Sequence, residues 1–123
     1  MVVHGGGPQI QQKLNQNKIE SKFIDGLRVT DNNIIGIVED VLLNEINPDL
    51  VKSIEKYGVN SVPVNAKNSD IIRVKGSKDS SLGFVADPDQ INEKIIKELL
   101  MNKKIPVIAP IGIDKTEQVY NIN

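Results

Sequence analysis

The sequence contains no cysteine among its 123 residues, which excludes a disulfide framework, a thiolate metal site and a cysteine nucleophile. Aromatic residues make up only 3%, which argues against a stacking surface for nucleic-acid bases. No apolar run approaches the ~20 residues of a membrane span, and no charged start leads into a signal-type core. The net charge is -1 and basic residues are spread along the chain, which argues against nucleic-acid or membrane partners. A cytoplasmic protein fits these absences best.

Arginine is scarce as well. Of the 15 basic residues only Arg28 and Arg73 are arginine, and the rest are lysine. A guanidinium can bind a carboxylate or phosphate in a bidentate manner, through two parallel hydrogen bonds, which an ammonium cannot do. On the residues alone, Arg28 is either a surface cation near a turn or a ligand for an anion. Arg73 is expected on a solvated strand face.

The 39% of hydrophobic residues is enough for one core, as in a domain of roughly 100 to 150 residues. Helices alternate with strands and no repeat is present, which predicts a layered α/β sheet with right-handed crossovers. Helices are predicted over residues 8–17, after a cap at Thr30 or Asp31, from Asn47 to Gly58, and after Asp87. Strands are predicted at residues 1–4, 61–64, 71–75, 82–86, 105–109 and 119–122, with a hairpin of residues 19–23 and 27–29 turning at Asp25-Gly26.

The segment His-Gly-Gly-Gly-Pro at residues 4–8 passes from a strand into a helix. The first N–H groups of a helix have no partners within it and lie at the positive end of the helix dipole, so they favour an anion such as phosphate. Pro8 suits the first turn, where its missing N–H is no loss. The alternative is a tight turn with no ligand. His4 is a general-base candidate by position, but we expect it to make structural hydrogen bonds, and no metal site is predicted.

Four separated segments resemble N-acetylglutamate kinase, and together the similarity covers essentially the whole chain. They are residues 3–10 (Val-His-Gly-Gly-Gly-Pro-Gln-Ile), 25–31 (Asp-Gly-Leu-Arg-Val-Thr-Asp), 105–112 (Ile-Pro-Val-Ile-Ala-Pro-Ile-Gly) and 120–123 (Tyr-Asn-Ile-Asn). The resemblance implies the amino-acid kinase fold, a three-layer αβα sandwich with a mainly parallel central sheet and a β-hairpin lid over residues 19–29. The form of the second segment points to N-acetylglutamate rather than to aspartate, carbamate or nucleotides.

The resemblance implies a transferase of arginine biosynthesis that moves the γ-phosphoryl group of ATP to the side-chain carboxylate of N-acetyl-L-glutamate. ATP is then a co-substrate that brings Mg²⁺ with it, and no tightly bound cofactor is expected. By the same resemblance, the amides of Gly6 and Gly7 face the phosphoryl group in transit, and Arg28 grips the α-carboxylate. Asn121 binds the same substrate by hydrogen bonds, and Asn123 lies beside it as support.

Several groups of the family pattern have no counterpart in these 123 residues. They are a lysine followed by paired glycines on an earlier strand, and an aspartate and a second lysine beyond Asn123. We therefore expect residues 1–123 to form an acetylglutamate-binding half of the domain, with an incomplete sheet, no catalytic residue of its own and no activity alone. Open sheet edges should make the isolated chain poorly behaved. Residues 65–70 depart from the glycine-richer family segment, and only Lys67 matches in kind, so that loop is given no role.

Three readings remain open at this point. The chain is either part of such a kinase or a non-catalytic ligand-binding module that keeps the acetylated amino acid site. A kinase relative that acts on another acylated amino acid is the third reading. The oligomeric state of a complete enzyme is left open, with a homo-oligomer allowed.

Overall fold

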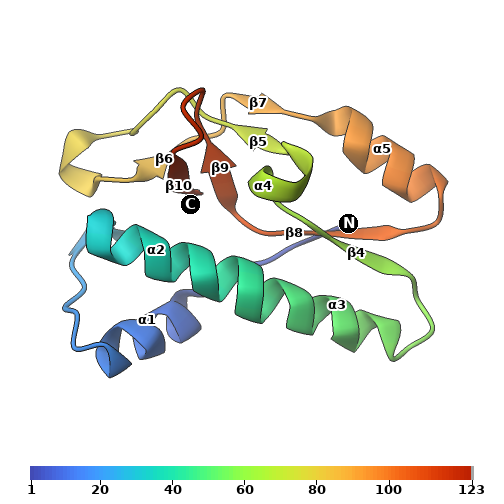
Figure 1. Cartoon of the computed structure of the whole chain (residues 1–123), viewed down its shortest axis with the longest axis horizontal. Coiled ribbons are helices and arrows are strands. Elements are labelled where there is room, and N and C mark those ends of the chain that lie inside the picture. The colour runs from blue at the N-terminus through green and yellow to red at the C-terminus, as the bar shows by residue number, and fades with distance from the viewer. Residues whose placement is uncertain (123) are drawn as a thin grey trace.

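A computed structural model describes residues 1–122 of the chain (Figure 1). Its α-helices are α1 (Gly7–Gln16), α2 (Asn32–Asp40), α3 (Asn47–Glu55), α4 (Ala66–Ser69) and α5 (Glu93–Met101), with a π-helical turn η1 (Val41–Ile46) and a 3₁₀ turn η2 (Ser80–Leu82). Its strands are β1 (Val2–Val3), β2 (Phe23–Ile24), β3 (Leu27–Arg28), β4 (Ser61–Val64), β5 (Ile72–Arg73), β6 (Val85–Ala86), β7 (Gln90–Ile91), β8 (Ile105–Ile108), β9 (Ile111–Ile113) and β10 (Val119–Ile122). The predicted alternation of helices and strands is confirmed.

Apart from the two-stranded β2–β3 hairpin, the strands form two sheets, which one segment of the chain connects. Parallel strands β1, β8 and β4 make the first sheet, with β8 in the middle. The second sheet has the order β6-β10-β9-β5-β7, in which β10 pairs parallel with β6 and antiparallel with β9. Only residues 109–110 separate β8 from β9, so one extended segment runs through both sheets (Figure 1). Most pairings are parallel, as expected.

Helices cover both faces of this layer (Figure 1). On one face, α1 and α2 pack against the sheet through a core that includes Leu14, Val38 and Ile111. On the other face, Ile96 and Leu99 of α5 pack against a second core that includes Val64 and Ile108. Because side chains alternate along a strand, successive residues of β9 and β10 enter opposite cores. The three layers confirm the predicted, incomplete αβα sandwich.

The longest helical unit runs without a break from α2 through the π-helical turn η1 into α3 (Figure 1). Asp31 caps it, as predicted, by accepting hydrogen bonds from the N–H groups of Asn33 (2.9 Å) and Ile34 (3.0 Å). The helix predicted from Asn47 is present as α3, but it is not a separate helix, because Asn47 continues the unbroken α2–η1–α3 helix, hereafter the α2–α3 rod. Its side chain makes no capping bond. Pro48 follows the π-helical turn, and such an irregular turn is where a helix tolerates a residue without an N–H.

Other differences arise where long-range pairing outweighs a local signal. The helix predicted after Asp87 begins only at Glu93, because Gln90 and Ile91 pair with β5 as strand β7. The sequence does not predict strand β9 (Ile111–Ile113), because the predicted strand at residues 105–109 ends before Pro110. The loop at residues 65–70 contains the single-turn helix α4, closed by a capping box between Asn65 and Asn68.

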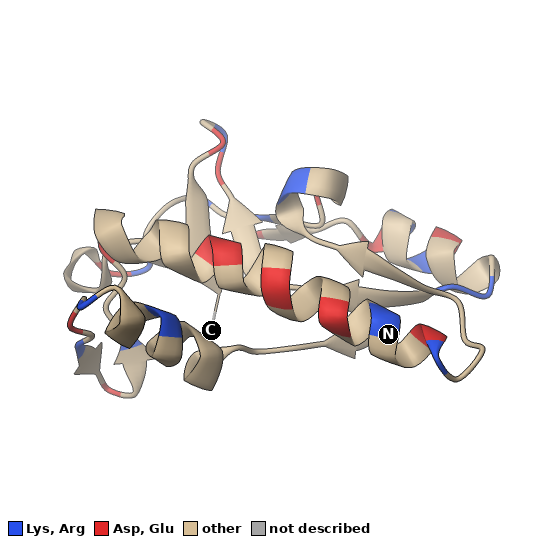
Figure 2. Ribbon diagram, turned by 60° about the horizontal axis from the view of Figure 1, so that its bottom comes forward, with Lys and Arg blue, Asp and Glu red and all other residues tan. Residues whose placement is uncertain are grey.

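Acidic residues recur along the α2–α3 rod, and basic residues are scattered over several elements (Figure 2). Within residues 1–122, no helix has both the length and the apolar character that a membrane crossing needs.

Candidate anion-binding cavity

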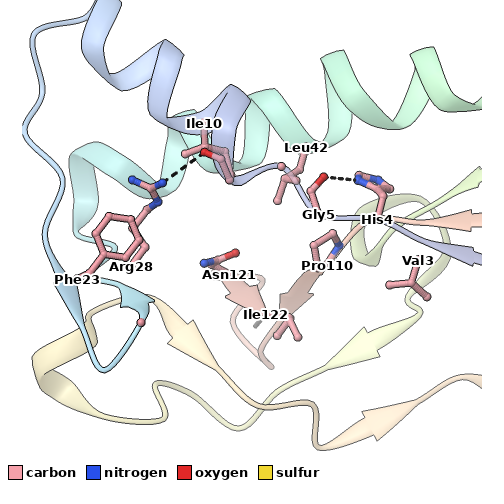
Figure 3. A pocket seen from close by; sticks show the side chains of 13 residues that line it. Val3, His4, Gly5, Ile10, Phe23, Arg28, Leu42, Pro110, Asn121 and Ile122 are labelled. Atoms are coloured by element: carbon pink, nitrogen blue, oxygen red, sulfur yellow. Dashed lines mark hydrogen bonds between the residues drawn. The ribbon is translucent and has the colours of Figure 1, made fainter.

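A cavity of about 500 Å³ opens where the glycine segment, the β2–β3 hairpin, η1 and the end of β10 meet (Figure 3). Its wall includes residues 3–7, Phe23, Arg28, Leu42 and Asn121. Arg28 is the one charged side chain among the described residues that line it, since the remaining lining is apolar apart from His4 and Asn121. A small anion therefore fits the electrostatics of this cavity better than a cation does.

The glycine segment forms the edge of the cavity at the start of α1. Gly6 is the N-cap, and its carbonyl accepts the N–H of Ile10 at 2.8 Å. Within residues 1–122, no hydrogen bond uses the N–H groups of Gly6 or Gly7. These free donors stand at the positive end of the helix dipole, which is the arrangement that binds anions. Pro8 occupies the first turn, as predicted.

Close packing, rather than backbone conformation, restricts the residue at position 6. A β-carbon on Gly6 would lie 2.6 Å from Cδ1 of Ile46 and 2.8 Å from Cδ2 of Leu42. Both contacts come from η1, so the rod packs directly onto the glycine segment. In contrast, a β-carbon on Gly5 or Gly7 would meet nothing within 4 Å. Of these three positions, the close approach of η1 therefore favours glycine at position 6 only.

Arg28 reaches the cavity from a tight hairpin. The turn residues Asp25 and Gly26 have φ values of 49° and 79°, which is the left-handed pair that a two-residue turn of this type needs. This turn places Phe23 directly opposite Arg28, with the guanidinium carbon 4.7 Å from the centre of the phenyl ring. Phe23 was not singled out from the sequence, although the register of a two-residue turn would have identified it as the partner of Arg28.

The partners of the Arg28 guanidinium are all neutral. It donates to Gln11 Oε1 (2.8 Å), to Ser21 Oγ and, at 3.5 Å, to the carbonyl of Gly7. None of the ion pairs among the described residues includes it. The residue is only 7% exposed, and this burial lowers the pKa of its guanidinium below the usual value. A buried cation without a carboxylate partner favours an anionic ligand.

Asn121 lies on β10, opposite Ile111 of β9. Val119 belongs to the core beneath α1 and α2, and Tyr120 belongs to the core on the other face. The alternation along the strand therefore returns Asn121 to the side of the glycine segment. Its side-chain amide points into the cavity between Arg28 and Pro110 (Figure 3). No hydrogen bond in the described part of the chain uses this amide, so both of its polar atoms are free for a ligand.

The structure thus brings Gly6, Gly7, Arg28 and Asn121, the four binding residues named from the sequence, to one cavity. Asn123, expected to support the substrate, lies outside the described residues. His4 also lines the cavity and makes hydrogen bonds to Gly5 and Asn47, in agreement with its predicted structural role. Asn47, which stands behind His4, was interpreted from the sequence only as a helix cap.

A helix-start glycine segment facing a buried arginine, on a mainly parallel αβα layer, defines an α/β protein with a candidate site for a small anion. The chain belongs to the amino acid kinase family, whose model matches residues 1–123.

Curated relatives named acetylglutamate kinase are similar to the whole chain. The protein of Pelagibacter ubique is 43% identical over 123 residues, and that of Rhodospirillum centenum is 45% identical over 135 aligned positions. The matches cover 100% of this chain but only 42% and 44% of those proteins. The chain therefore spans less than half the length of these relatives.

Solved structures share the fold. The structure of smu.665 from Streptococcus mutans superposes with a TM-score of 0.92 at 30% identity, over 99% of this chain and 50% of that protein. An N-acetylglutamate synthase from Neisseria gonorrhoeae, solved with coenzyme A and N-acetyl-glutamate, superposes with a TM-score of 0.79 at 14% identity. It covers 98% of this chain and 28% of that protein, and it supports the fold alone.

Proposed function

We propose that this chain forms the N-acetyl-L-glutamate-binding half of a kinase that transfers the γ-phosphoryl group of ATP to the side-chain carboxylate of that substrate. The observation that carries the proposal is the buried guanidinium of Arg28, which has only neutral partners and shares one cavity with the free amides of the glycine segment. The name shared by the curated relatives supports the same substrate.

In the proposed complex, the α-carboxylate of the substrate supplies the negative charge that Arg28 lacks, and the amide of Asn121 donates to and accepts from the same molecule. The far carboxylate then lies near the N–H groups of Gly6 and Gly7. Its oxygen attacks the γ-phosphorus, the bond from phosphorus to the bridging oxygen breaks, and ADP leaves with that electron pair. No proton has to be removed from a carboxylate, so the reaction needs no general base.

Such a transfer depends on positioning and on neutralising the charge of the phosphoryl oxygens. The N–H groups at the start of α1 supply fixed dipoles for this purpose. The Mg²⁺ that accompanies ATP is part of the substrate, and residues 1–122 contain no cluster of three or more metal-ligating side chains. We propose that the charged catalytic groups belong to a nucleotide-binding half beyond these residues, and that residues 1–123 alone do not catalyse the reaction. A cytoplasmic location stays a prediction.

The test is a protein in which this chain is joined to the C-terminal half, with the preceding strand, of the Pelagibacter ubique relative. We expect ADP formation that requires N-acetyl-L-glutamate, together with an acyl phosphate that hydroxylamine traps. A folded fusion that forms neither product would contradict the proposal. A panel of other acylated amino acids separates N-acetylglutamate from a related substrate.

A non-catalytic binding module is the second candidate, because the cavity needs only residues of this chain. Calorimetry on the chain with N-acetyl-L-glutamate, without ATP, measures this binding directly. Binding combined with an inactive, folded fusion would favour the module over the kinase. A chain that does not bind at all would remove the module.

A further inference from the structure

Asn47 is a polar residue in the middle of the α2–α3 rod, yet it is 0% exposed. In a regular helix five residues turn through about 500°, so Asn47 would lie about 140° away from Leu42. The π-helical turn η1 adds a residue, and its i to i+5 bonds bring Asn47 back under Leu42 on the buried face. The irregular turn is therefore what places an amide against the sheet.

The side chain of Asn47 connects strand β8 to His4. Its Nδ2 atom donates to the carbonyl of Val107 at 2.9 Å and lies 3.0 Å from Nε2 of His4. The Val107 carbonyl only accepts, so the atom facing it must be the Nδ2 donor and not Oδ1. The second hydrogen of Nδ2 then points at Nε2 of His4, which must accept it. The proton of a neutral His4 ring is therefore on Nδ1.

That proton has one acceptor nearby. Nδ1 of His4 lies 3.1 Å from the carbonyl oxygen of Gly5, on the side away from Arg28 and Asn121 (Figure 3). A peptide unit is planar and trans, so its C=O and N–H point in opposite directions. Holding the Gly5 carbonyl toward His4 therefore turns the N–H of Gly6 toward the cavity. Gly5 has no side chain that would fix this peptide.

The series of hydrogen bonds from Val107 through Asn47 and His4 to Gly5 also leaves one buried polar atom unsatisfied. Among the described residues, Oδ1 of Asn47 is buried without a hydrogen-bond partner. An unsatisfied buried acceptor commonly destabilises a fold by about 1 to 3 kcal/mol. An apolar side chain at position 47 would avoid this loss but would leave the tautomer of His4 unspecified. The retained amide is thus explained by its effect on His4.

We propose that His4 is a positioning residue, held in its Nδ1–H tautomer by Asn47, which orients the Gly5–Gly6 peptide so that the Gly6 N–H faces the phosphoryl group. This role rests on the proposed function, because it names what the Gly6 N–H is oriented for. His4 takes no proton from the substrate, since its Nε2 is occupied by Asn47 and its Nδ1 donates to the backbone. It acts through Gly6 and touches no reacting atom.

The first test is the ¹⁵N spectrum of the imidazole ring in the labelled protein. We expect a protonated Nδ1 and an unprotonated Nε2 in the neutral form, and a larger share of the Nε2–H tautomer in Asn47→Leu. An Nε2–H ring in the unsubstituted protein would overturn the proposal. This readout needs neither a ligand nor activity, so it stands apart from the test of the proposed function.

The second test uses two substitutions of similar size that each keep one end of the imidazole. His4→Asn keeps a donor at the place of Nδ1, and His4→Gln keeps an acceptor at the place of Nε2 but no donor to Gly5. Inorganic phosphate is the probe, and the amide signal of Gly6 is the readout. We expect the phosphate-induced shift in the unsubstituted protein and in His4→Asn, and an apparent affinity about tenfold weaker in His4→Gln.

Equal phosphate responses in His4→Asn and His4→Gln would overturn the positioning role, as would a Gly6 signal that phosphate leaves unmoved in the unsubstituted protein. The affinity for N-acetyl-L-glutamate, measured in the same samples, should fall by less than the phosphate affinity in His4→Gln, because Arg28 still binds the α-carboxylate and only the contact with Gly6 is weakened. A complete loss of that affinity in His4→Gln would show a merely structural role and would also overturn the proposal. Failure of the unsubstituted protein to bind N-acetyl-L-glutamate would instead count against the proposed function.

Discussion

The two arginines of this chain stand beside two cavities of nearly equal size and opposite character. Arg28 lines a cavity of about 500 Å³, and Arg73 lines one of about 480 Å³ at the other end of the sheet. Arg73 pairs with Asp70, with Glu117 at 3.3 Å, and with the carbonyl of Asp114 at 3.0 Å. Arg28 has neutral partners only. The volumes alone therefore do not show which of the two cavities is the better candidate for a ligand site.

The charges do separate them, and the pKa values of the two side chains move in opposite directions. Burial lowers the pKa of Arg28, whereas the hydrogen bond to Asp70 raises the pKa of Arg73. Nearby Lys75 likewise pairs with Asp89 at 2.7 Å. Two of the three cations that line the second cavity, Arg73 and Lys75, are already paired, and an anion that binds either of them must displace an existing partner. The third, Lys115, has no ion pair among the described residues. The positive charge of Arg28 in the first cavity is buried and has only neutral partners, and this difference supports the proposal that the first cavity is the ligand site.

Exchanging each arginine for alanine is the strongest test of this difference. We expect Arg28→Ala to weaken binding of N-acetyl-L-glutamate by about a hundredfold, since a bond to a charged group contributes about 1.5–3 kcal/mol. Arg73→Ala should leave that affinity unchanged. Calorimetry on both variants measures these affinities. Arg28→Lys shows whether a positive charge without bidentate hydrogen bonding is sufficient for binding. Equal losses in the two alanine variants would remove the distinction between the cavities.

The packing of the glycine segment offers a second test. Gly6→Ala places a methyl group against Leu42 and Ile46, and we expect it to lower the free energy of unfolding by about 1–3 kcal/mol. Gly5→Ala has open space and should change stability by less than about 0.5 kcal/mol. Urea unfolding measures both. The same midpoint for the two variants would mean that η1 does not press on Gly6.

The neutral wall of the first cavity offers a third, smaller effect. Asn121→Asp adds a negative charge where the substrate carboxylate is proposed to lie, so we expect binding to weaken about tenfold beyond the effect of Asn121→Ala. Asn33→Asp adds the same charge at the exposed start of α2 and serves as the control. If Asn121→Asp bound N-acetyl-L-glutamate as tightly as the control, the amide would not face the ligand.

Local patterns in the sequence were sufficient where one short segment decides its own structure. The apolar run at residues 105–109 forms β8, and Asp25-Gly26 forms the predicted two-residue hairpin turn. The four binding residues converge on one cavity because each lies at a strand end, a helix start or a hairpin tip. Their roles toward the substrate stay predictions.

The sequence could not show what depends on distant partners. Asn47 resembles a helix cap locally, and only the Val107 carbonyl, 60 residues away, explains its burial. Strand β9 follows Pro110 and contains Gly112, which fits because a β-carbon there would lie 2.7 Å from Val74. The neutral surroundings of Arg28 likewise require the positions of Gln11 and Ser21. These features depend on tertiary packing between distant segments, which local sequence patterns do not show.

The smallest expected effect concerns Asp114, whose carbonyl accepts a hydrogen bond from Arg73 and whose carboxyl group should make the stability of the fold depend on pH. The Asp114 carboxylate accepts from the hydroxyl (2.7 Å) and the N–H (2.8 Å) of Thr116, and the pKa of Asp114 lies below its usual value chiefly through that hydroxyl bond. A carboxyl with a lowered folded-state pKa stabilises the fold above its unfolded pKa of about 3.9 and loses that contribution as the pH falls further. Urea unfolding from about pH 6 to about pH 3 should therefore show a shallower decline in Asp114→Asn than in the unsubstituted chain. Asp25→Asn, in the hairpin turn on the side of Arg28, should keep the full decline, and a curve as shallow as that of Asp114→Asn would show that the two regions do not differ in this respect.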